Sequence, residues 1–156
     1  MPALRVIAIA LIVLSLAPLA MSKDIALISN KSNSVTDVAL ADLVKMSKGQ
    51  TLRWPDGKPV TVVLRNLDSP DAKLILEKVY AMPKGEIMAL INSANHGGTS
   101  RPVIILVESD EAIVQKVAST PGAIGMVDVY SITGGIQVVK ISGKLPLEPG
   151  YPLHGN

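Results

Sequence analysis

The stretch VTVVLRNLDSPD, residues 60–71, decides how this chain folds and where its function is to be sought. Its first five residues are apolar or β-branched and predict a buried strand that ends at Arg65. Ser69 and Pro70 then predict the start of a helix, because a hydroxyl at the N-cap and a proline in the first turn favour initiation. A cation, a hydroxyl and unpaired helix N–H groups in one small volume are typical of an anion-binding site.

The same residues also fit a helix start that binds nothing. In that interpretation Ser69 is only the N-cap, Asp71 is an acid that suits the helix dipole, and Arg65 pairs with Asp68 or Asp71. Two hypotheses therefore stay open for this segment. It holds an oxyanion through Arg65, Asp68, Ser69 and Asp71, or it is a structural cap.

Outward from this segment, strand-like and helix-like patterns alternate along the chain. Such alternation predicts an α/β domain with a mixed, largely parallel sheet that helices cover on both faces. Further strands are predicted at 24–29, 102–107, 123–127 and 136–141, and helices at 36–49, 70–80, 83–95 and 109–118.

The first 22 residues have the pattern of a signal peptide. Arg5 supplies a positive start, an apolar run follows at 6–14, and the small residues Ala20 and Ser22 form a cleavage site. We therefore expect export to the periplasm or beyond the cell, and no other segment is long and apolar enough to span a membrane. The domain is expected at 23–144, followed by a flexible, Pro- and Gly-rich tail at 145–156.

Composition excludes several classes of function. A net charge of +2 over 156 residues argues against a nucleic-acid binder, and the absence of cysteine excludes disulfides and thiolate chemistry. His96 and His154 have no metal-ligand spacing, so neither a metal nor another cofactor is expected. The sequence has no nucleophile motif or catalytic carboxylate pair, so we expect a protein that is not an enzyme.

Three landmarks in order give the chain a resemblance to a known family. They are Arg53-Trp54 before a turn, Val62-Val63-Leu64-Arg65 followed by Ser69, and the stretch TPGAIGMV at 120–127. Over about residues 24–141 this order resembles one lobe of the phosphate-binding proteins of bacterial ABC importers, which have the type II periplasmic binding fold. The third landmark is the most specific, because Gly125 allows its strand to pack closely against a neighbour.

The resemblance implies a function and a site. Arg65 and Ser69 fall on the family's arginine and serine ligands, whereas Asp68, Pro70 and Asp71 depart from its pattern. It implies an exported domain that binds phosphate or a similar tetrahedral oxyanion, as a substrate-binding or accessory component of phosphate uptake or sensing, with an envelope transporter or receptor as partner.

The loop residues Gly98, Thr99 and Arg101 are additional candidate contacts for the anion. The alternative function is a protein-interaction module of the cell envelope that retains the fold without binding a ligand.

Overall fold

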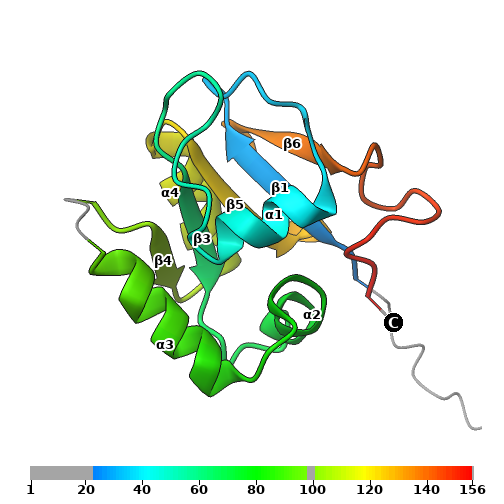
Figure 1. The fold of residues 1–156 in the computed structure, drawn as a ribbon. Coiled ribbons are helices and arrows are strands. Elements are labelled where there is room, and N and C mark those ends of the chain that lie inside the picture. Colours follow the sequence, from blue (N-terminus) through cyan, green and yellow to red (C-terminus); the bar gives the residue numbers. More distant parts are fainter. Residues whose placement is uncertain (1–22, 98–100, 156) are drawn as a thin grey trace, which may run out of the picture.

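The protein contains one six-stranded sheet with the strand order β2-β6-β1-β5-β3-β4 (Figure 1). The structure, a computed structural model, describes residues 23–97 and 101–155, so the predicted signal peptide at 1–22 lies outside it. Three strand pairs are parallel (β3 with β4, β3 with β5, β2 with β6), and β1 is antiparallel to β5 and β6. The predicted α/β fold with a mixed, largely parallel sheet is confirmed. The strands are β1 (Ile25–Asn30), β2 (Asp37–Val38), β3 (Thr61–Arg65), β4 (Ile104–Val107), β5 (Ala123–Asp128) and β6 (Ile136–Ile141).

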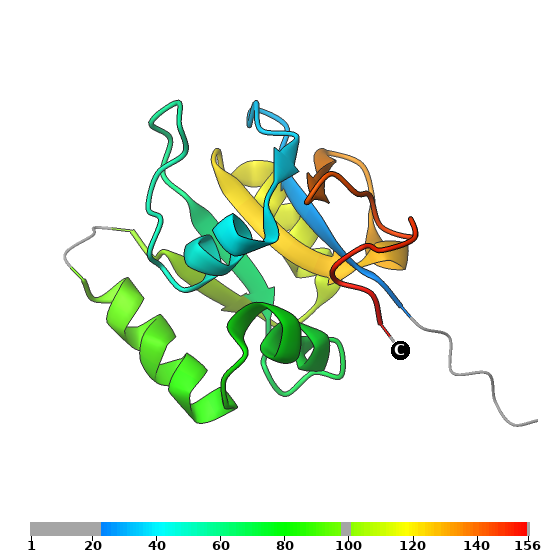
Figure 2. The ribbon, with the colours of Figure 1, turned by 45° about the vertical axis from the view of Figure 1, so that its right-hand side comes forward.

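Helices cover both faces of this sheet (Figures 1 and 2). Helix α4 packs on one face, and α1, α2, η1 and α3 pack on the opposite face. The helices are α1 (Leu40–Ser47), α2 (Ala72–Ile75), the π-helical turn η1 (Leu76–Tyr80), α3 (Lys84–Asn95), α4 (Asp110–Ser119) and the 3-10 turn η2 (Val129–Ser131).

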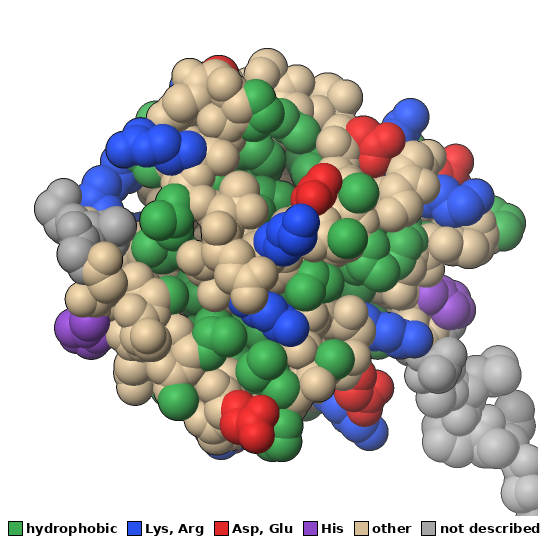
Figure 3. Space-filling model, in the orientation of Figure 1, with side chains coloured by type: hydrophobic (Ala, Val, Ile, Leu, Met, Phe, Trp, Pro, Cys, Tyr) green, Lys and Arg blue, Asp and Glu red, His purple; other side chains and the backbone are tan. Residues whose placement is uncertain are grey.

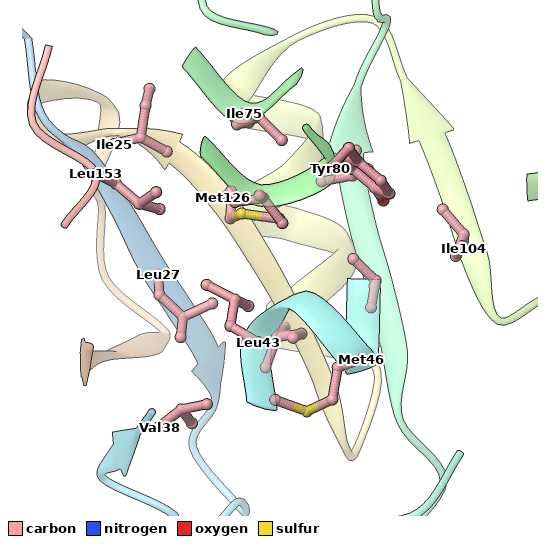
Figure 4. Packing of buried hydrophobic residues seen from close by; sticks show 14 of the residues in the cluster. Ile25, Leu27, Val38, Leu43, Met46, Ile75, Tyr80, Ile104, Met126 and Leu153 are labelled. Carbon is pink, nitrogen blue, oxygen red and sulfur yellow. The ribbon is translucent and has the colours of Figure 1, made fainter. Parts of the chain in front are cut away.

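The strands build two cores because successive side chains point to opposite faces. In β1, Ile25 and Leu27 contribute to the core under α1 and α3, whereas Ala26 and Ile28 contribute to the core under α4. Figure 4 shows the larger core, in which Leu43 of α1 lies over the sheet close to Leu27. Since all four β1 residues are almost fully buried, the predicted strand at 24–29 is confirmed as a central strand.

Gly125 explains how closely α4 approaches the sheet. A Cβ atom at this position would lie 2.5 Å from Ile113 Cγ2 and 3.0 Å from Val117 Cγ2, both on α4. Only glycine leaves the required space, as the sequence predicted for this strand. The close packing of α4 on β5 sets the position of the helix start, where Asp110 lies.

One predicted helix begins later than expected. The sequence pattern predicted a helix from Thr36, but α1 begins at Leu40. The preceding residues form β2, in which Asp37 and Val38 pair with Lys140 and Ile141 of β6. A strand partner distant in sequence therefore overrides the local helical pattern.

The C-terminal segment, residues 145–155, packs against the start of β1, and Figures 1 and 2 show the red end of the chain beside the blue strand. Leu153 is fully buried, its carbonyl accepts a hydrogen bond from Ile25 N at 3.0 Å, and Tyr151 Oη donates to Ile25 O at 2.8 Å. This packing corrects the expectation of a flexible tail after Lys144. Composition favoured a loose segment, but its two apolar side chains complete the larger core.

Candidate functional site

The carboxyl ends of three parallel strands meet at one edge of the sheet. Arg65 ends β3, Asp110 begins α4 shortly after β4, and Asp128 ends β5. Because β1 runs antiparallel to β5, Lys23 comes to the same edge just before β1 begins. Open α/β sheets bind their ligands at the carboxyl ends of such strands. This edge is therefore the place where a ligand site is expected.

Arg65 is held by two carboxylates. Its Nη1 lies 3.3 Å from Asp71 Oδ2 and 3.8 Å from Asp110 Oδ1, and its side chain is 31% exposed. The first contact confirms that Arg65 and Asp71 lie together, and it closes the loop between β3 and α2. The guanidinium remains partly open to solvent, so its other N–H groups are available to a ligand that competes with the carboxylates.

A chain of charged groups continues from Arg65 along the edge. Asp128 N donates a hydrogen bond to Asp110 Oδ2 at 3.2 Å, and Lys23 Nζ lies 3.1 Å from Asp128 Oδ2. Burial raises the pKa of Asp110, although the hydrogen bond from the Asp128 amide opposes this change. The pKa of Lys23 is raised by its hydrogen bond to Asp128. These contacts join residues from four separate segments in one electrostatic network.

Asp110 was missed as a site residue by sequence reasoning. In the sequence it is one of two acids in the first turn of a helix, which favour the helix dipole without any ligand. Its place beside Arg65 depends on the parallel pairing of β3 with β4. One signal could have identified Asp110. It lies at a helix start that follows a predicted strand, and such a position brings a side chain to the carboxyl end of the sheet when that strand pairs with the strand of Arg65.

Ser69 is not the N-cap of the helix, and the predicted cap is wrong. Helix α2 begins at Ala72 with Asp71 in the N-cap position, and no side chain accepts a capping hydrogen bond there. The carbonyl of Ser69 instead accepts from Ala72 N at 3.1 Å, within a turn that precedes the helix. The local signal of serine before proline is therefore overridden by the turn at 66–71.

The hydroxyl of Ser69 is buried and has no hydrogen-bond partner among the described residues. Two other buried side-chain atoms share this condition: Asn33 Nδ2, beyond the opposite end of β1, and Ser47 Oγ, at the end of α1. A buried hydroxyl left unpaired costs about 1–3 kcal/mol. Ser69 lies within the loop that the Arg65–Asp71 pair closes.

Asp68 does not take part in this cluster. Its carboxylate forms an ion pair with Lys84 at the start of α3, and both side chains are largely exposed. Such a surface pair contributes little to stability, typically about 0–1 kcal/mol. The structure therefore separates Asp68 from the other predicted site residues, Arg65, Ser69 and Asp71.

The glycine-rich loop does not bring its arginine to the site. Gly98 and Thr99 lie outside the described residues. Arg101 lies before β4 and borders a hollow with Thr61, the first residue of β3. Since β3 and β4 are parallel, Arg101 is at the opposite edge of the sheet from Arg65. The prediction that Arg101 contacts the same anion is corrected by this placement.

Two observations limit the chemistry of the described part of the chain. Over residues 23–97 and 101–155, no group of three or more His, Cys, Asp or Glu side chains has the arrangement to hold a metal ion. Within the same ranges, no helix is long and apolar enough to cross a membrane. The site instead offers a guanidinium, a free hydroxyl and carboxylates, which suit the binding of a hydrogen-bonding polar ligand.

Comparisons with known proteins show where this fold occurs. Neither a protein-family model nor a curated protein matches the chain. Solved structures do match. An ABC-type phosphate transport receptor from Vibrio cholerae superposes with a TM-score of 0.70 at 17% identity, covering 86% of this chain and 54% of the receptor.

Two further matches agree with the first. PstS from Borrelia burgdorferi gives a TM-score of 0.68 at 17% identity, over 86% of this chain and 55% of that protein. A phosphate ABC transporter substrate-binding protein with bound phosphate from Clostridium perfringens gives 0.63 at 23% identity, over 78% and 46%. This chain thus spans about half the length of the structures it matches. It has the fold of phosphate ABC transporter substrate-binding proteins over a single lobe, as its sequence landmarks predicted.

Proposed function

We propose that this chain is an exported, non-enzymatic binding module for phosphate or a similar tetrahedral oxyanion. It would serve as a substrate-binding or accessory component of phosphate uptake or sensing in the cell envelope. The observation that carries the proposal is the buried hydroxyl of Ser69, which has no partner among residues 23–97 and 101–155 and lies in the loop closed by Arg65 and Asp71. The fold supports it, since the matched structures from Vibrio cholerae and Clostridium perfringens are named for phosphate.

The mechanism is charge-assisted hydrogen bonding. Arg65 donates guanidinium N–H groups to two oxygens of the anion, and Ser69 Oγ donates its proton to a third oxygen. The partly exposed position of Arg65 at the end of β3 lets an anion approach from solvent. An unpaired buried hydroxyl costs free energy in the free protein, and the hydrogen bond from Ser69 to the anion removes this cost.

The neighbouring carboxylates select for an anion that carries a proton. Asp71 and Asp110 both lie near Arg65, and an ionised carboxylate can only accept hydrogen bonds. Hydrogen phosphate can donate its O–H to such a carboxylate. Sulfate has no proton near neutral pH, so the carboxylate only repels it. The site is therefore expected to favour phosphate over sulfate.

The affinity for phosphate expected of a site formed by one edge of one sheet is modest. A partly solvated charge-assisted contact is worth about 1 kcal/mol. Three or four such contacts give about −4 kcal/mol, which corresponds to millimolar affinity. Tighter binding would require a second surface that closes over the anion.

Isothermal titration of residues 23–156 tests this function. We expect saturable phosphate binding at about 0.01 M salt, where the screening length is about 30 Å, and weaker binding of sulfate. Arg65→Gln keeps a polar side chain but removes the guanidinium and its charge, so it should abolish the heat of phosphate binding. Binding that is equal for phosphate and sulfate would contradict the proposed role of the carboxylates.

A second candidate function has its own observation. Arg65 is already neutralised by Asp71 and Asp110, so the network is satisfied electrostatically without a ligand. This favours a protein-interaction module of the cell envelope that kept the fold and lost the anion. The titration separates the two candidates, because an interaction module gives no phosphate heat in either the natural chain or the Arg65→Gln variant.

Export is a separate part of the proposal. It depends on the predicted signal peptide at 1–22, and it places the mature N terminus near Lys23. Mass spectrometry of the protein from the soluble envelope fraction should give a first residue near Lys23. A chain that still begins at Met1 and sediments with membranes would contradict export.

A further inference from the structure

A hollow of about 390 Å³ opens beside the loop of the proposed site. Its volume lies within the range of about 300–1,000 Å³ that is usual for small-molecule sites. Asp71 borders both this hollow and Arg65, so the two are contiguous. A single orthophosphate, with five non-hydrogen atoms, would leave most of this space to water, since one water occupies about 30 Å³.

The lining carries more positive than negative charge once the ion pairs are taken into account. Asp71 is paired with Arg65, and Lys23 is paired with Asp128. The remaining charged groups are Lys73, Glu77 and Lys78, whose two ammonium groups outnumber one carboxylate. In the part of the chain that the structure describes, neither lysine has a carboxylate within 4.0 Å.

Lys73 lies on α2 and Lys78 on the π-helical turn η1, and both border the same hollow. Lys78 follows Leu74 by four residues and Glu77 follows Lys73 by four, so these lining residues lie on one face of the helical segment. From Leu76 onward the helix widens, and Ala81 N donates to Leu76 O at 2.7 Å across five residues. Such insertions cost helix regularity and occur frequently at functional sites.

Figure 3 shows the corresponding surface, where blue and red side chains lie close together around α2 and near the C-terminal end of the chain. Ile25, Pro70 and Leu74 form the apolar part of the lining. The hollow is thus a charged recess with a partly apolar lining, adjacent to the anion site.

We infer that this hollow binds the second phosphoryl group of a condensed phosphate, of which pyrophosphate is the simplest. The inference rests on the proposed function, since the first phosphoryl group occupies the site of Arg65 and Ser69. The second group extends past Asp71, whose charge is offset by Arg65, and meets the ammonium groups of Lys73 and Lys78. The ligand class is therefore broader than orthophosphate alone.

The experiment compares orthophosphate with pyrophosphate on residues 23–156 and on two double variants. Lys73→Gln with Lys78→Gln removes both cations from the hollow. Lys45→Gln with Lys140→Gln is the matched control, because it removes the same charge from two exposed lysines that do not line the hollow. The control separates contact in the hollow from general attraction by net charge. All four lysines are exposed, and circular dichroism confirms that each variant is folded.

We expect the natural chain to bind pyrophosphate about three- to tenfold more tightly than orthophosphate, because each exposed charge pair adds a factor of a few. The hollow variant should lose this preference and keep its orthophosphate affinity within about twofold, while the control keeps the preference. If a double variant does not fold, the single substitutions Lys73→Gln and Lys78→Gln should each lower the preference partially.

Two results overturn the inference while the proposed function stands. The first is that orthophosphate binds and pyrophosphate binds no more tightly. The second is that the hollow variant and the control lower the pyrophosphate affinity equally. Absence of binding for both anions has a different meaning. It removes the proposed function, and the inference falls with it.

Discussion

Arg65 Nη1 lies 3.3 Å from Asp71 Oδ2, and this contact joins the end of β3 to the residue that precedes α2. The carboxylate occupies one side of the guanidinium that an oxyanion would otherwise use. Asp71 therefore sets both the strength and the selectivity of anion binding at this edge. Its substitution gives the first prediction.

Asp71→Asn should raise the affinity for sulfate several-fold at low salt and reduce the preference for phosphate over sulfate. The amide keeps the shape of the side chain but removes the negative charge that repels sulfate. The gain should fade as salt increases, because screening weakens the interaction. Titration at two salt concentrations measures both effects. Asp56→Asn is the control, since Asp56 pairs with Lys58 in another part of the chain; an equal gain in the control would refute the local explanation.

Ser69→Ala should weaken phosphate binding without lowering the free energy of unfolding. The Ser69 hydroxyl makes no hydrogen bond in the described structure and does not cap α2, so its removal loses no contact. Ser109→Ala is the matched control, because Ser109 Oγ accepts a capping hydrogen bond from Ala112 N at 3.1 Å. The control should lose about 1 kcal/mol in urea unfolding. A comparable loss in Ser69→Ala would mean that Ser69 is structural after all.

Asp110→Asn should become more stable relative to the natural chain as pH rises. Burial raises the pKa of Asp110 above its ordinary value of 3.8, so the folded protein holds this proton in a range where the unfolded chain has lost it. Through that range the stability contributed by Asp110 falls with increasing pH, and asparagine has no such titration. Urea unfolding of both proteins from about pH 4 to about pH 6 measures the difference. A difference that is constant with pH, or one that changes in favour of Asp110, would contradict the assignment.

Leu153→Ala should lower the free energy of unfolding by about 2–5 kcal/mol, the usual range for a buried leucine. Leu153 is fully buried against the larger core, although it lies near the end of the chain. Leu147→Ala, in the same segment but 63% exposed, should change stability by no more than about 0.5 kcal/mol. Equal small effects in both variants would show that residues 145–155 are loose.

Local signals predicted those parts of the fold whose conformation is decided by neighbouring residues. The apolar run at 60–64 supplies most of β3 (Thr61–Arg65), and the strand within 120–127 requires glycine at 125 because α4 packs on it. The late start of α1 was not predictable in this way, since β2 forms only by pairing with β6. The packing of Leu153 likewise depends on β1, at the other end of the chain.

The residues of the candidate site also differ in whether local sequence or long-range strand pairing decides their position. Arg65 and Asp71 are close in sequence, and their pairing was among the predicted alternatives. Asp110 reaches Arg65 only through the pairing of β3 with β4, so no local pattern marks it. Ser69 was assigned to a cap because serine before proline is a strong local signal, but the turn before α2 uses its backbone instead.

The most direct measurement is a phosphate titration of ¹⁵N-labelled residues 23–156 followed by ¹H–¹⁵N correlation spectra. The account predicts saturable shifts of the amide signals of residues 65–69 and 71, with a midpoint near millimolar phosphate. Arg65→Gln should remove these shifts and leave the remaining spectrum unchanged. Absence of shifts in the natural chain, or shifts that persist in Arg65→Gln, would contradict the claim that this edge of the sheet binds phosphate.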